Sequence, residues 1–162
     1  MALTNAQKNT LKNDILTSVN PAIVAARGNG ADIGRDDTTL AALYNAKAVP
    51  ITKAWMTAVY RDDMFGAMNI AKYDNLTAGK RDSWRMMCDY SPISFAKGKL
   101  RKAVTDIWGA ADAAVILDNF TENASRAEVL FGGNTATEST VTALVRDWTG
   151  TITIDDLGQA FR

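Results

Sequence analysis

The sequence contains no histidine and only one cysteine among its 162 residues. Without histidine, the chain lacks the commonest general base and the commonest metal ligand, and no serine–histidine or cysteine–histidine pair can form. Cys88 has no partner for an intramolecular disulfide, and its neighbours Met86, Met87 and Tyr90 indicate a thiol that packs as a small apolar group. We therefore expect a protein that is not an enzyme and that holds no cofactor and no metal; lysine or carboxylate chemistry stays open, but no residue spacing indicates it.

The sequence also lacks an excess of either charge, because 18 basic residues balance 18 acidic ones. This balance argues against sequence-specific nucleic-acid binding, which depends on phosphate neutralisation. No apolar run approaches the roughly 20 residues that span a bilayer. The N-terminal stretch MALTNAQKNTLKNDIL does not have the basic and then apolar pattern of a secretory signal. We expect a protein made and used in a cytoplasm, without membrane contact.

Apolar residues at i, i+3, i+4 spacing predict amphipathic helices along most of the chain. Thr4 and Gln7 have the spacing of a capping box that starts a helix at about residues 5–19. Pro50 separates two further patterns and predicts a pair of helices there rather than a pair of strands. These two patterns are Leu40–Tyr44 and Trp55–Tyr60. The remaining helical patterns are Thr77–Cys88, Leu100–Trp108 and about Ala111–Phe131. With 47% apolar residues, the chain can bury one core.

The last thirty residues change in character. Thr, Val and Ile dominate residues 139–154, and TGTITI alternates as strands do, with Ile152 and Ile154 on one side. Asp155 then has the character of a cap for a closing turn. We predict a mainly α fold, in which residues 1–133 form a bundle of about five to six helices and residues 134–162 form a β-prone hairpin or extended arm.

Several polar and aromatic features have a plain structural interpretation. The glycine-rich loop at Gly28–Gly34 follows no strand and lacks GK[ST], so we expect a surface loop rather than a nucleotide site. Paired aspartates such as Asp36 and Asp37 lie at helix boundaries and are expected to act as caps rather than as magnesium ligands. Three tryptophans lie on apolar helix faces and are predicted to be core anchors, namely Trp55, Trp84 and Trp108.

A cluster of basic residues has two interpretations. It consists of Lys97, Lys99, Arg101 and Lys102. It is either a solvated helix start, or a surface that faces DNA in a channel or an acidic partner.

Five segments resemble, in the same order, a family of small and largely uncharacterised tailed-bacteriophage proteins, typically encoded among the head and head-to-tail connection genes. These segments are Leu40–Asp63, Asn75–Trp84, Leu100–Gly109, Ala124–Gly132 and Trp148–Ala160. The resemblance implies a structural protein of the virion. The leading hypothesis is a head-to-tail connector subunit, an adaptor or head-closure protein, made in the bacterial host cytoplasm and located in the neck of the virion. Minor capsid or decoration protein, tail terminator, tail-fibre attachment protein and non-virion host-interaction protein stay open.

In the connector hypothesis the partners are the portal protein, neighbouring neck or tail proteins and further copies of the chain in a ring, with DNA passing nearby. Every subunit of such a ring uses two different surfaces. A β-prone arm can pair with an exposed strand of a neighbour. The expected anchors of that arm are Trp148, Ile152, Ile154 and Phe161.

Overall fold

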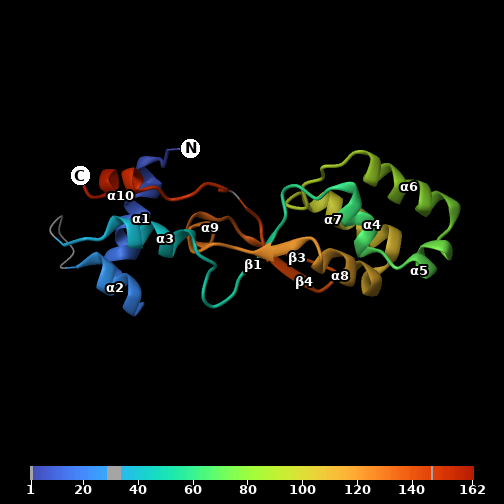
Figure 1. The fold of residues 1–162 in the computed structure, drawn as a ribbon. Helices are drawn as coiled ribbons and strands as arrows, with labels where there is room; N and C mark the ends of the chain where they lie inside the picture. The colour runs from blue at the N-terminus through green and yellow to red at the C-terminus, as the bar shows by residue number, and fades with distance from the viewer. Residues whose placement is uncertain (1, 29–33, 147) are drawn as a thin grey trace. The chain divides into compact units, whose positions relative to one another are not determined.

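Two separate hydrophobic cores organise the chain in the computed structural model, which describes residues 2–28, 34–146 and 148–162. Unit 1 comprises Met1–Ile51, Ala124–Gly133 and Asp147–Arg162, and unit 2 comprises Thr52–Asn123 and Asn134–Arg146 (Figure 1). Residues 134–162, expected as one arm, are divided between the two units. Most of the glycine-rich loop at Gly28–Gly34 lies outside the described residues.

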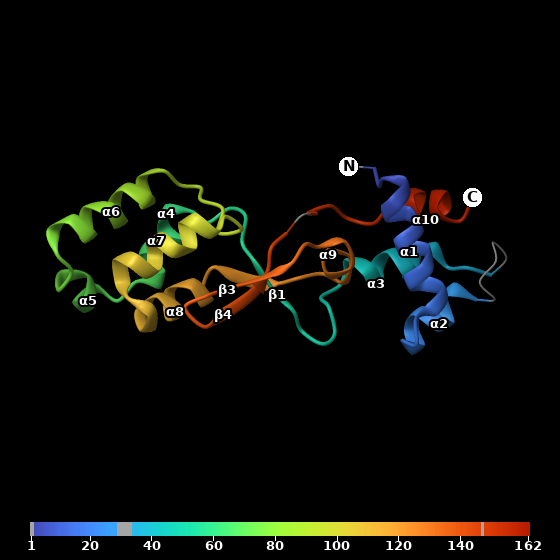
Figure 2. The ribbon, with the colours of Figure 1, turned by 180° about the vertical axis from the view of Figure 1, so that it is seen from behind.

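Five helices are described in unit 1. They are α1 (Asn5–Thr17), α2 (Pro21–Arg27), α3 (Asp37–Asn45), α9 (Arg126–Phe131) and α10 (Ile154–Ala160). The predicted capping box at Thr4 and Gln7 is confirmed, and Asp36 caps α3 as expected. The N-terminal helix α1 packs against the C-terminal helix α10, so the two ends of the chain lie side by side (Figures 1 and 2). Both ends therefore contribute to one core.

Unit 2 combines helices with a sheet. The helices are α4 (Arg61–Ala67), α5 (Ile70–Asp74), α6 (Ala78–Asp89), α7 (Gly98–Trp108) and α8 (Ala110–Asp118). The strands are β1 (Lys53–Trp55), β2 (Thr121–Asn123), β3 (Thr135–Glu138) and β4 (Val141–Leu144), in the order β2-β1-β4-β3. The β1–β2 and β3–β4 pairs are antiparallel, and the central β1–β4 pair is parallel. The predicted helical bundle is therefore wrong: the described residues form a mixed α/β fold.

The core of unit 2 is rich in aromatic rings. Trp84 meets Trp108 edge to face at 5.3 Å between ring centroids, and Phe95 stacks on Phe120 at 4.5 Å. Trp55 is fully buried, and its indole N–H donates to the Ala136 carbonyl at 3.3 Å. The prediction that these three tryptophans are core anchors is confirmed. Cys88 is also fully buried, as its apolar neighbours indicated.

The helix expected around Trp55 is wrong. Lys53, Ala54 and Trp55 pair instead with Asn123, Glu122 and Thr121 of β2, and Ala54 also pairs with Leu144 of β4. These partners lie far along the chain, where a local helical period cannot indicate them. Side-chain burial between two neighbouring strands overrides the local helical pattern.

The long helix expected at about residues 111–131 is divided into α8, β2 and α9. Asn119 ends α8, and the Thr121 hydroxyl donates to the Asp118 carbonyl. Ser125 then starts α9 with a capping box to Glu128, a Ser-x-x-Glu spacing that marks a helix start within the expected helix. The apolar residues belong to two short helices with β2 between them.

The alternating segment TGTITI forms no strand. The Ile152 amide donates to Asn45 Oδ1 and the Asn45 side-chain N–H donates to the Ile152 carbonyl, both at 2.8 Å. The side-chain amide of Asn45 therefore makes the two hydrogen bonds that the backbone of a neighbouring strand would otherwise make with Ile152. Thr153, rather than Asp155, caps α10 through a capping box with Asp156.

Gly150 lies against the indole of Trp148, and we expect Gly150→Ala to destabilise unit 1. A Cβ there would lie 2.6 Å from Trp148 Cζ2, and Trp148 is held in the core. Overpacking of this kind costs about 1–3 kcal/mol. Gly79→Ala, in a helical position with open space around it, should instead be neutral or stabilising. Thermal unfolding of both variants tests this; equal melting temperatures would contradict it.

Candidate partner-binding site

An open apolar groove on unit 2 is the candidate functional site. We call it the α6–α7 groove; its volume is about 580 Å³. Its apolar lining comes from α6, α7 and the loop between them: Met86, Met87, Tyr90, Pro92, Ile93, Leu100, Ala103 and Ile107. Ser83, Ser94, Lys97 and Asp106 add polar groups. Met86 and Met87 have flexible side chains that can adapt to the side chains of a protein partner.

Helix α6 explains how the groove is formed. Trp84 and Cys88, one turn apart, are fully buried on its inner face. Met86 and the C-cap residue Tyr90, also one turn apart, lie on the opposite side and are 56% and 77% exposed. Met86 and Tyr90 both line the groove and extend its apolar surface to the outside. A contiguous exposed apolar surface of this kind is typical of a contact with another molecule.

The groove lies in the basic part of a neutral chain. Between Ala78 and Trp108 there are seven basic and three acidic residues. The basic ones are Lys80, Arg81, Arg85, Lys97, Lys99, Arg101 and Lys102, and the acidic ones are Asp82, Asp89 and Asp106. Because the whole chain is neutral, the remaining residues carry the compensating negative charge. The lining itself holds one lysine and one aspartate, Lys97 and Asp106, and the excess of basic residues lies around the groove. An occupant with acidic groups at its edges is therefore favoured.

Arg101 does not belong to a basic surface. Its side chain is buried, and its Nη1 donates to the carbonyls of Phe95 at 2.6 Å and Ala96 at 2.8 Å. Its guanidinium also lies 4.8 Å from the Trp55 ring, and burial lowers the pKa of Arg101. Arg101 therefore orders the loop before α7, which corrects its expected role in facing DNA or a partner. Lys97, Lys99 and Lys102 are exposed, and Lys102 forms an ion pair with Asp106 at 2.9 Å.

The expected anchors of the C-terminal arm are placed differently as well. Trp148 and Ile152 are buried in the core of unit 1, where Trp148 meets Phe131 edge to face at 5.2 Å. Phe161 is half-buried, with the Arg35 guanidinium 4.1 Å from its ring. Only Ile154 is exposed among the four. Three of these side chains stabilise unit 1 in this structure, so they do not form a free arm.

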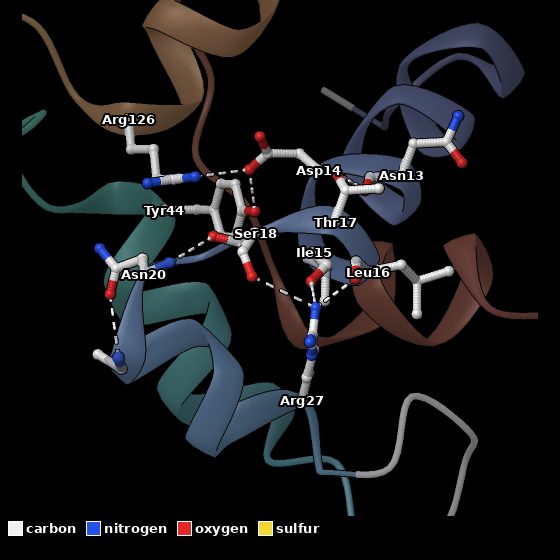
Figure 3. A network of polar contacts seen from close by, with 11 residues as sticks. Asn13, Asp14, Ile15, Leu16, Thr17, Ser18, Asn20, Arg27, Tyr44 and Arg126 are labelled. Carbon is white, nitrogen blue, oxygen red and sulfur yellow. Dashed lines mark hydrogen bonds and ion pairs between the residues drawn. The ribbon is translucent and has the colours of Figure 1, made fainter.

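A polar cluster in unit 1 joins three helices (Figure 3). The Tyr44 hydroxyl donates to Asp14 Oδ2, and Arg126 Nη2 donates to the same oxygen at 2.8 Å. Burial, and then the hydrogen bond to Asp14, raise the pKa of Tyr44, so the phenol stays protonated and cannot act as a general base. Beside it, Arg27 Nη1 donates to the carbonyls of Ile15 at 3.0 Å and of Leu16 at the end of α1. The cluster is a structural clamp.

Asp14→Asn should weaken this clamp. The amide keeps the size of the side chain but removes the charge that Tyr44 and Arg126 contact, at a cost of about 1–2 kcal/mol because the ion pair is partly exposed to solvent. Asp82→Asn is the matched control, because Asp82 is exposed on α6. Urea unfolding measures both. If Asp14→Asn lowers the free energy of unfolding no more than Asp82→Asn does, the cluster does not act as a clamp.

Cys88 should make stability depend on alkaline pH. Burial raises the pKa of its thiol to about 11, above the value near 9 of an exposed thiol. The unfolded chain therefore loses the proton first, so the contribution of the thiol is complete below about pH 9 and is lost as the pH rises to about 11. Two pKa units correspond to on the order of 2–3 kcal/mol. We expect Cys88→Ala to lose less stability than the wild type between pH 8.5 and 11 in urea titrations; parallel curves would contradict this.

The described ranges contain no group of three or more acidic or cysteine side chains that could hold a metal ion. Within the same ranges, no helix is both long and apolar enough to cross a membrane. Comparisons with models of known protein families, with curated proteins and with solved structures find no match to this chain.

The α6–α7 groove was not predicted, although the sequence contains a signal for it. The apolar pattern assigns Met86, Met87 and Tyr90 to the surroundings of Cys88. The helical period places Met86 and Tyr90 about 160° away from Trp84 and Cys88. If one pair faces the core, the other pair must face away from it.

Proposed function

We propose that this protein binds other proteins as a structural subunit of a tailed-phage particle, and that it forms a ring on the portal protein as a head-to-tail connector. The observation that carries the binding role is the exposed Met86–Tyr90 pair in an open apolar groove. Placement in a phage neck rests on the five ordered segments that resemble the phage family. The subunits would be made in the host cytoplasm, join the neck of the virion, and surround DNA without reading its sequence.

The test is electron microscopy of the protein, alone and mixed with the portal protein encoded by the same genome. We expect a ring of subunits on the tail-facing end of the portal. The double variant Met86→Asp/Tyr90→Asp should lose this association because two charges enter the apolar groove. Val19→Asp is the matched control, since Val19 is 93% exposed on unit 1 and lies outside the groove.

Two outcomes would contradict the proposal. No association with an intact portal would argue against the connector, and proteomics of purified particles would then separate a decoration protein from one absent from the particle. Loss of association in the Val19→Asp control as well as in the groove variant would argue against the groove as the contact.

A further inference from the structure

Unit 2 carries a second apolar surface, which is flanked by acidic residues, whereas basic residues surround the groove. We call it the α8 face; it consists of Ala111, Val115 and Asp118 with Asp112 on its flank. Ala111, Val115 and Asp118 are exposed and follow the i, i+4, i+7 spacing of one helix face. Val115 is 65% exposed, although the buried residues of the same helix face the core. This face is therefore an apolar projection beside two carboxylates.

The α8 face and the groove have opposite charge. Helix α8 contains two acidic and no basic residues, whereas the groove segment contains three more basic than acidic residues once the buried Arg101 is left out. In one copy Asp118 pairs with Lys53 and Asp112 pairs with Lys72. Both pairs are solvent-exposed, so each contributes little to stability and can exchange partners at low cost.

The α8 face and the α6–α7 groove also have complementary shapes. Val115 projects from α8, whereas the α6–α7 groove is hollow and apolar. Tyr90 projects at the groove, whereas a second hollow of about 540 Å³ lies beside Val115. Lys53, Asp118 and Thr142 contribute polar groups to that hollow, which can bind a tyrosine hydroxyl. Each surface offers a projection and a depression to the other.

We propose that the α6–α7 groove of one copy binds the α8 face of a second copy. This inference rests on the proposed ring, and it names the two surfaces that each subunit would use. Both surfaces belong to unit 2, so the contact does not depend on unit 1. Because the surfaces differ, the contact is heterologous, and its repetition gives a closed ring or an open filament.

Paired cysteine substitutions test the contact directly. Met86→Cys and Val115→Cys are prepared as separate full-length chains, mixed, and treated with a short bismaleimide crosslinker at high protein concentration and on portal-bound assemblies. A heterologous contact predicts a crosslinked dimer in the mixture and much less in either variant alone. Native Cys88 is fully buried and is present in every sample, so wild type gives the background. Val19→Cys mixed with Met86→Cys is the exposed control.

Charge reversal gives an independent readout. We expect Asp112→Lys/Asp118→Lys to weaken self-association measured by sedimentation velocity by about tenfold or more. Mixing this variant with Lys97→Glu/Lys99→Glu/Lys102→Glu should restore association between unlike chains, which loss of folding could not do. Circular dichroism of both variants checks that they are folded.

The outcomes separate this inference from the proposed function. Particles or portal complexes that contain the protein but give no Met86–Val115 crosslink overturn the contact and leave the connector standing. A Met86–Val115 crosslink in a protein that is absent from particles supports the contact and overturns the connector. Dimers of Met86→Cys alone, at the yield of the mixture, overturn the heterologous arrangement.

Discussion

A chain that ends at Gly133 is expected to lose the fold of both units rather than an arm. The deletion removes β3 and β4, which are two of the four strands described in unit 2. It also removes Trp148, Ile152 and Leu157 from the core of unit 1. A buried tryptophan contributes about 3–5 kcal/mol and a buried leucine about 2–5 kcal/mol. Their combined loss is comparable to the whole stability of a domain, about 5–15 kcal/mol.

A second truncation provides the control. A chain that ends at Arg146 keeps every residue of unit 2 and lacks only α10 and the segment before it. Hydrogen exchange should show amide protection in unit 2 but not in unit 1 for this chain, and in neither unit for the chain that ends at Gly133. Cooperative unfolding of the shorter chain, with wild-type protection in α6 and α7, would show that residues 134–162 are an arm after all.

Features decided by neighbouring residues were predicted well. The capping box at Thr4 and Gln7, the Asp36 cap and the apolar face with Trp84 and Cys88 all depend on residues within one or two helical turns. Their interactions form inside the same short segment, so the spacing of residue types is sufficient evidence.

Features decided by distant partners were not predicted. Trp55 lies in a strand because residues 121–123 and 144 pair with its segment. Ile152 lies in extended backbone because Asn45 supplies both of its hydrogen bonds. In each case the partner is about 65 or more residues away along the chain, and a local period contains no information about it.

The candidate site also contains features of both kinds, those decided by neighbouring residues and those decided by distant ones. The outward position of Met86 and Tyr90 follows from helical geometry and could have been inferred from the sequence. Arg101 could not, because its spacing among lysines is that of a surface residue, while its burial depends on the carbonyls of Phe95 and Ala96 and on the Trp55 ring. Whether a basic residue within a cluster is exposed or buried depends on the structure of the neighbouring loop, and the sequence pattern does not give that structure.

Trp84→Ala is expected to destabilise unit 2 by about 3–5 kcal/mol. The side chain is fully buried, and its loss leaves a cavity and removes the edge-to-face contact with Trp108. Trp84→Phe should cost less, because the ring remains and the indole N–H, which has no hydrogen-bond partner among the described residues, is removed. Urea unfolding followed by hydrogen exchange measures the loss and assigns it to unit 2.

Met86→Ala, two residues along the same helix, is the matched substitution. Its side chain is exposed, so its truncation should change the free energy of unfolding by less than about 0.5 kcal/mol. If the groove binds a partner, the same substitution should weaken that association. An equal loss of stability in Trp84→Ala and Met86→Ala would show that α6 has one role, in the core. A loss of folding in the first and of association in the second would show that its two faces have different functions.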